Sequence, residues 1–83
     1  MAALDDLVAA YRRAERAVPA AERAAEARVK AAREARTAAR QALALGIVEA
    51  WHAETSQAEI ARRTGYSREQ VRRILRAHGV QPE

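Results

Sequence analysis

The sequence predicts an all-α protein, and three observations support that fold class. Alanine supplies 23 of the 83 residues, and alanine is the strongest helix former. Only three glycines and two prolines interrupt the chain, which is too few for the turns of a sandwich or barrel. Apolar residues recur at spacings of three and four, the period of an amphipathic helix. Because the chain is short and contains no cysteine and no phenylalanine, we expect it to depend on helix propensity and on a second copy of itself.

The first expected helix covers about residues 3–18, and Asp5 and Asp6 suit the positive end of its dipole. Pro19 follows, and it either opens a new helix or kinks a continuous one. We favour a break, because Glu22 would lie in the first turn of the next helix. One face of this first segment is apolar and consists of Leu4, Leu7, Val8, Tyr11, Ala14 and Val18.

The second expected helix covers about residues 20–53, and its apolar face changes in size along the chain. The first part of that face is thin, with Ala21, Ala25, Val29, Ala32, Ala35 and Ala39. Later positions are bulky, namely Leu43, Ile47, Val48 and Trp51. We expect residues 1–40 to form an N-terminal helical segment that makes a homodimer as a coiled coil, either parallel or antiparallel. The same helix is expected to continue into a C-terminal domain over residues 41–79.

Two short capped helices are expected in that domain. Ser56 with Glu59, and Ser67 with Gln70, have the spacing of a capping box, so helices should cover residues 57–64 and 68–77. Gly65 can adopt positive φ in the turn between them. His78 and Gly79 are expected to end the second helix, and residues 80–83, which include Pro82, are expected to form a loose tail.

Two helices joined by a short glycine turn form a helix-turn-helix unit, which needs an apolar inner face and a covering helix. The expected inner face consists of Ile60, Ala61, Tyr66, Val71, Ile74 and Leu75. Leu43, Ile47 and Trp51, just upstream, supply the covering helix. The sequence therefore predicts a three-helix unit at the C-terminal end.

The stretch from Gln57 to Leu75 resembles the homeodomain-like helix-turn-helix of bacterial regulators, and also the DNA-binding domains of resolvases and invertases. The resemblance covers about residues 43–78. Its small residue, turn glycine and core apolar positions correspond to Ala61, Gly65, Val71 and Ile74. Thr64 departs from the pattern, because a larger apolar residue is common there. The resemblance implies binding to double-stranded DNA, with the helix 68–77 in the major groove.

Charge supports the same interpretation. The chain carries a net charge of +4, and the excess lies in residues 55–83, where six arginines face three glutamates. Arginine suits bidentate contacts with guanine and phosphate. The residues expected to contact bases begin the second helix, where Arg68 and Arg72 should point outward: Ser67, Arg68, Glu69, Arg72 and Arg73. Glu69 could instead pair with Arg73. Those expected to contact phosphates are Ser56, Gln57, Arg62, Arg63, Tyr66, Gln70 and Arg76.

The sequence thus predicts a small dimeric transcriptional regulator or plasmid or phage control factor, located in the bacterial cytoplasm with the nucleoid. Two alternatives stay open: a helical scaffold or interaction protein that uses the alanine-rich helix, and a non-specific nucleoid-associated DNA binder. No catalytic constellation is visible, so we expect no enzyme activity. We also expect no cofactor, no metal, no small-molecule ligand and no membrane partner, since no stretch of the chain approaches bilayer-spanning length.

Overall fold

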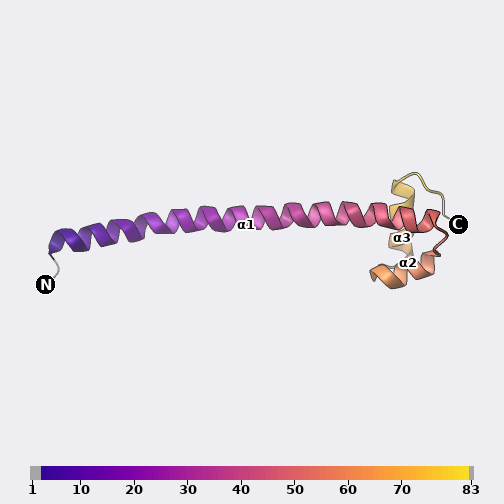
Figure 1. Ribbon diagram of the computed structural model, residues 1–83, viewed down its shortest axis with the longest axis horizontal. Coiled ribbons are helices and arrows are strands. Elements are labelled where there is room, and N and C mark those ends of the chain that lie inside the picture. The colour runs from indigo at the N-terminus through magenta and orange to yellow at the C-terminus, as the bar shows by residue number, and fades with distance from the viewer. Residues whose placement is uncertain (1–2, 83) are drawn as a thin grey trace. The chain divides into compact units, whose positions relative to one another are not determined.

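The computed structural model describes residues 3–82 and contains three helices, α1 (Leu4–His52), α2 (Gln57–Thr64) and α3 (Arg68–Ala77) (Figure 1). Over those residues it contains no strand, which confirms the predicted all-α class. The bounds of α2 and α3 agree with the predicted ranges. The chain divides into two compact units, Met1–Ala35 and Arg36–Glu83.

The expected break at Pro19 is wrong, because α1 continues through this residue as one helix of 49 residues. An interior proline removes one backbone hydrogen bond and clashes with the preceding turn, at a cost of about 3 kcal/mol. The residues on both sides are rich in alanine, arginine and glutamate, which favour the helix. Glu22 therefore lies inside α1 rather than in the first turn of a second helix. Asp5 and Asp6 lie in the first turn of α1, as predicted.

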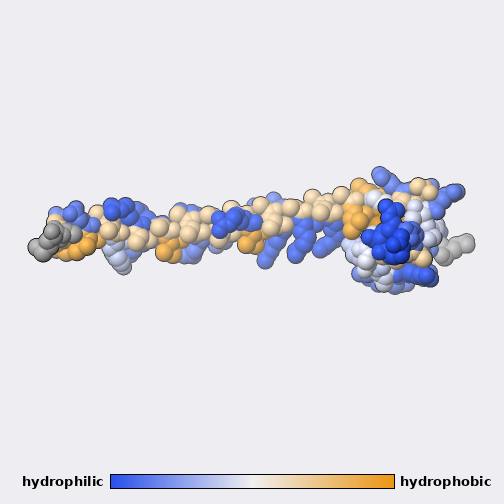
Figure 2. Space-filling view, turned by 60° about the horizontal axis from the view of Figure 1, so that its bottom comes forward, coloured by the Kyte–Doolittle hydropathy of each residue, from blue (hydrophilic) through white to orange (hydrophobic). Residues whose placement is uncertain are grey.

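The first part of α1 exposes an apolar face. All residues from 3 to 43 are exposed, including large side chains such as Leu4 (74% exposed), Tyr11 (64%) and Val18 (57%). Figure 2 shows apolar side chains at intervals along α1. We call one face of α1, on which positions follow each other at spacings of three and four, the α1 stripe. Its apolar members are Leu4, Leu7, Tyr11, Ala14, Val18, Ala21, Ala25, Val29, Ala32, Ala39 and Leu43, and the position between Ala32 and Ala39 is occupied by Arg36. Among the helices of residues 3–82, none combines the length and apolar character that crossing a membrane requires.

The core of the second unit contains one or two residues from each helix. Ile47 of α1, Ile60 of α2, and Val71 and Leu75 of α3 are buried together. Seven apolar residues pack around them while half-buried: Val48, Ala50, Trp51, Ala61, Tyr66, Ile74 and Val80. Leu43 was expected in this covering face and is not part of the core cluster, and its side chain is 40% exposed.

The chain reverses direction between α1 and α2, so that α2 runs back along the end of α1 (Figure 1). Thr55 N–H donates to the carbonyl of Ala50 at 2.9 Å, and Glu54 N–H donates to that of Trp51 at 2.9 Å. These two bonds form a Schellman motif, in which one residue must have left-handed backbone geometry. Glu54 takes that position with φ of 68°, where glycine is the usual residue.

The same motif ends α3, and it draws the C-terminal residues onto the core. Val80 N–H donates to the carbonyl of Leu75 at 2.9 Å, and Gly79 N–H donates to that of Arg76 at 3.0 Å. Gly79 has φ of 78°. Val80 packs against the core and Pro82 is buried. The prediction of a loose tail is therefore corrected for residues 80–82, because the apolar residue after a Schellman glycine folds back on the helix; Glu83 lies outside the described residues.

Candidate nucleic-acid interface

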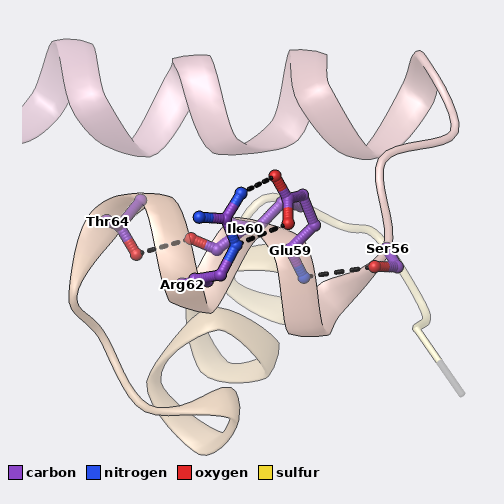
Figure 3. Close-up of polar contacts among 5 residues, drawn as sticks. All are labelled: Ser56, Glu59, Ile60, Arg62 and Thr64. Carbon is purple, nitrogen blue, oxygen red and sulfur yellow. Dashed lines mark hydrogen bonds and ion pairs between the residues drawn. The ribbon is translucent and has the colours of Figure 1, made fainter.

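The first turn of α2 has half of the predicted capping box. Ser56 has extended backbone geometry, and its hydroxyl accepts a hydrogen bond from Glu59 N–H at 3.1 Å. The Glu59 carboxylate does not complete the box, because it is occupied by Arg62 one turn later (Figure 3). Arg62 donates from Nε to one carboxylate oxygen at 2.8 Å and from Nη2 to the other. Gln57 is the first residue of α2 and is half-buried.

This ion pair changes the titration of both partners. The hydrogen bond from Arg62 lowers the pKa of the Glu59 carboxyl from 4.5, against a smaller opposing effect of desolvation. The charges of Arg62 and Arg63 lower that pKa further. In return, the hydrogen bond to Glu59 raises the pKa of Arg62. Arg62 was predicted to contact phosphate, and in the free protein its charge is balanced by Glu59.

The turn between α2 and α3 depends on Thr64 and Gly65. Gly65 has φ of 78° and donates its N–H to the carbonyl of Ala61 at 2.9 Å. The Thr64 hydroxyl donates to the carbonyl of Ile60 at 2.8 Å and accepts from Tyr66 N–H at 3.2 Å. Thr64 therefore joins the end of α2 to the turn by polar contacts where the related family often has an apolar residue.

The start of α3 has the complete capping box that was predicted. The Ser67 hydroxyl accepts from Gln70 N–H at 3.1 Å, and Gln70 Oε1 accepts from Ser67 N–H at 2.9 Å. Both Ser67 and Gln70 are exposed. Their side chains thus fix the first turn of α3, whose exposed residues were predicted to contact DNA.

The two faces of α3 differ sharply in burial. Val71 and Leu75 are fully buried, while Arg73 and Arg76 are exposed. Arg72 was expected to point outward, but it is half-buried, and its Nη1 lies 3.6 Å from Glu69 Oε2. The alternative pairing of Glu69 with Arg73 is wrong, because Glu69 forms its ion pair with Arg72, three residues along the helix.

Exposed cations without an acidic partner gather on these two helices. Within α2 and α3, four exposed arginines have no carboxylate of the described residues within 4.0 Å, namely Arg63, Arg68, Arg73 and Arg76. Figure 2 shows strongly hydrophilic side chains over this end of the molecule. Unpaired guanidinium groups retain their donors for an anionic partner.

A groove of about 730 Å³ lies beside α3, between it and residues 40–45 of α1. Leu45 and Ile74 contribute apolar side chains to its walls, and Arg40 and Arg73 contribute cations. Tyr66 also lines this groove while packing against the core. Arg40 thus shares a cavity wall with residues predicted to contact DNA.

The structure brings most of the predicted site residues onto α2, α3 and the turn between them. Sequence reasoning did not find the roles of Thr64 and Glu54. A hydroxyl side chain next to a glycine at a helix end is a signal for the first role. The sequence has no comparable signal for Glu54, which takes a left-handed position where glycine is usual. The packing of Val80 was also not predicted, and the signal for it is the apolar residue that follows Gly79.

Comparison with protein-family models, curated proteins and solved structures found no match for the chain. The resemblance of residues 57–75 to the homeodomain-like family therefore stays a prediction.

Proposed function

We propose that the protein binds double-stranded DNA in a sequence-specific manner, as a small dimeric regulator without enzyme activity. In this proposal α2, the turn at Gly65 and α3 form a helix-turn-helix, and the end of α1 is the third helix of a homeodomain-like unit. The observation that carries the proposal is the set of unpaired exposed arginines on α2 and α3, beside a core to which α3 contributes the buried Val71 and Leu75.

In this arrangement α3 enters the major groove with its first turns at the base edges. Ser67, Arg68, Glu69, Arg72 and Arg73 are the proposed base contacts. Arg73 is the best placed of them, because it is exposed and carries no ion pair in the described chain. Glu69 Oε2 lies 3.6 Å from Arg72 Nη1, so the carboxylate attracts this guanidinium toward the start of α3 without a hydrogen bond.

Phosphate contacts are proposed for the flanks of the unit. The start of α2, at Ser56 and Gln57, offers backbone donors and the positive end of a helix dipole. Arg63 and Arg76 supply unpaired charge, and Arg62 supplies the guanidinium donors that Glu59 does not use. Tyr66 and Gln70 complete the proposed set. These contacts position the protein without selecting a sequence.

The N-terminal part of α1 is proposed to supply the dimer interface. It exposes several large apolar side chains, which a single chain leaves in water. A dimer gains affinity through effective concentration and recognises two half-sites, about 34 Å apart or a multiple of that distance.

Selection of bound fragments from a random DNA library tests the proposal, followed by binding measurements on the selected site and on random DNA. We expect Arg73→Ala to weaken binding to the selected site by about 5- to 150-fold, the range for one bidentate base contact, with little effect on random DNA. Arg63→Ala is the matched control, because it is also an exposed and unpaired arginine. It should weaken binding to all sequences alike and reduce the salt slope by about one.

Three outcomes contradict the proposal. If Arg73→Ala lost equal affinity for the selected site and for random DNA, Arg73 would make no base contact. Saturating binding without a selected sequence would favour a non-specific nucleoid protein. No binding at low or moderate salt would favour a helical interaction protein.

A further inference from the structure

We infer that α1 pairs with α1 of a second copy in the antiparallel direction, in the register that places Ala25 opposite the partner's Ala25. This inference rests on the proposed dimer and not on DNA binding. It names the direction of the pair, the residues that face each other, and a groove on each copy that accepts the start of the partner's α1.

Exposure of large apolar side chains is the first reason for a partner. Leu4, Leu7, Tyr11 and Val18 are between 57% and 74% exposed. They lie on one face of α1 because they follow each other at spacings of three and four. Burying them against a helix with the same face removes this apolar surface from water in both copies.

Side-chain size sets the direction. Four of the six bulky members of the α1 stripe lie before residue 20, and from residue 20 to residue 40 its apolar members are alanine apart from Val29; Leu43 follows at its end. In the antiparallel register Leu7 faces the partner's Leu43, Tyr11 faces the partner's Ala39, and Val18 faces the partner's Ala32. Large residues meet small ones along most of the pair, so the distance between the helices stays even. A parallel pair would instead place Tyr11 on Tyr11 and Ala39 on Ala39, and the helices would be too far apart at one end.

The charge of Arg36 also favours the antiparallel direction of the pair. Arg36 occupies the position in the α1 stripe between Ala32 and Ala39. A parallel dimer would place it against the partner's Arg36, and two like charges would repel each other across the interface. In the antiparallel register Arg36 faces the partner's Ala14, which leaves space for its side chain, and the adjacent Glu15 of the partner supplies the opposite charge.

A groove in the second unit continues the α1 stripe. It has a volume of about 230 Å³ and is lined by residues that include Leu43, Gly46, Ala50 and Ile60. Gly46 weakens the middle of a helix, and a side chain at this position would meet nothing within 4 Å in its own chain. In the antiparallel register the partner's Leu4 lies over Gly46. The open space at this glycine therefore accepts a leucine side chain of the second copy.

Cysteine crosslinking tests the direction of the pair, since the natural chain contains no cysteine. We expect the double variant Leu7→Cys/Leu43→Cys to give a covalent dimer with a short bismaleimide crosslinker at low protein concentration. Each single variant should give little or none, because its cysteine faces leucine. Efficient crosslinking of either single variant would show a parallel pair and overturn the inference, and so would the absence of crosslinking in all three variants.

A charge swap provides a second test that does not depend on crosslinking. Arg36→Glu and Glu15→Arg should each raise the dimer dissociation constant by about 2- to 30-fold, because two symmetric surface ion pairs are lost. The double variant should restore the dimer, and sedimentation equilibrium measures all four proteins. Residues 15 and 36 are too far apart along one helix to pair within a chain, so rescue identifies the partner. Failure of rescue overturns the antiparallel register. DNA binding is measured separately on the natural chain, so the failure of the DNA proposal is distinguishable from the failure of this one.

Discussion

At the scale of single residues, the positive φ of Glu54 gives a direct test of backbone strain. A side chain in this left-handed geometry costs about 1–2 kcal/mol, and glycine avoids this cost but loses more freedom on folding. We expect Glu54→Gly to increase the free energy of unfolding by about 0.5–1 kcal/mol, measured by urea unfolding. Glu54→Ala is the control, since it removes the charge but keeps the strain, and it should give no such gain.

Gly65 provides the opposite case with similar backbone geometry. Its φ is 78°, and a side chain built there would meet nothing within 4 Å. Gly65→Ala should therefore lower the free energy of unfolding by about 1 kcal/mol through the backbone alone. An unchanged value for both Glu54→Gly and Gly65→Ala would contradict the left-handed geometry of these two turns.

The ion pair of Glu59 and Arg62 predicts a pH dependence at low pH. Because the folded-state pKa of Glu59 is lowered from 4.5, mainly by the hydrogen bond from Arg62, the folded protein favours the charged carboxylate. This contribution to stability is present above pH 4.5 and is lost as the pH falls through the folded-state pKa. We expect the difference in unfolding free energy between the natural chain and Glu59→Gln to shrink below that pH. A difference that stays constant from neutral to acidic pH would show that the ion pair does not stabilise the fold.

At the scale of the helices, local signals predicted more than distant ones. The bounds of α2 and α3 follow from their own first and last residues, because Ser56, Ser67 and Gly65 satisfy backbone groups within a few positions of the chain. The capping box at Ser56 is incomplete because Glu59 has a competing partner in Arg62, and spacing does not decide between two partners. The exposure of Leu43 depends on where α2 and α3 cover α1, and that is a tertiary property.

Pro19 and the C-terminal residues illustrate two other limits. At Pro19 the free-energy cost of one proline inside a helix is smaller than the summed helix propensity of the residues on both sides, so the helix continues. For residues 80–82, the composition of the tail indicated mobility, whereas the glycine at 79 followed by valine sets the Schellman contact with Leu75. For the candidate nucleic-acid interface, the sequence predicted which arginines lie on α2 and α3. It did not predict that Arg62 and Arg72 are paired with glutamates.

The two helix caps allow a matched comparison. Ser67→Ala should lower the free energy of unfolding by about 1 kcal/mol, because Gln70 N–H loses its acceptor. Ser56→Ala should cost a similar amount, since it also removes one acceptor. Ser67→Asp keeps an acceptor at the cap and is expected to retain stability. Urea unfolding measures the three variants, and a loss for Ser67→Asp equal to that for Ser67→Ala would contradict the capping role.

At the scale of the whole molecule, we expect the exposed start of α1 to link its secondary structure to the proposed association of two chains. No side chain from residue 3 to residue 43 is buried within one chain, so this part of the helix is stabilised by helix propensity and by contacts within the helix such as the Lys30–Glu34 ion pair, and Pro19 opposes it. Far-ultraviolet circular dichroism should therefore show less helix as the protein is diluted below the dimer dissociation constant. Pro19→Ala should reduce this loss, because it removes a cost of about 3 kcal/mol from the helix interior. A helix content independent of concentration would contradict the link.

The exposure of α1 also has a consequence for how cells could control the protein. If ordering of this segment requires pairing, a newly made chain at low abundance is incompletely structured and, under the proposed DNA binding, lacks the contact with a second half-site. Occupancy of a binding site then rises more steeply than expression level, since each increment of synthesis both completes the fold and supplies the pair. Gene dosage alone would give such a system a threshold, without any small-molecule signal.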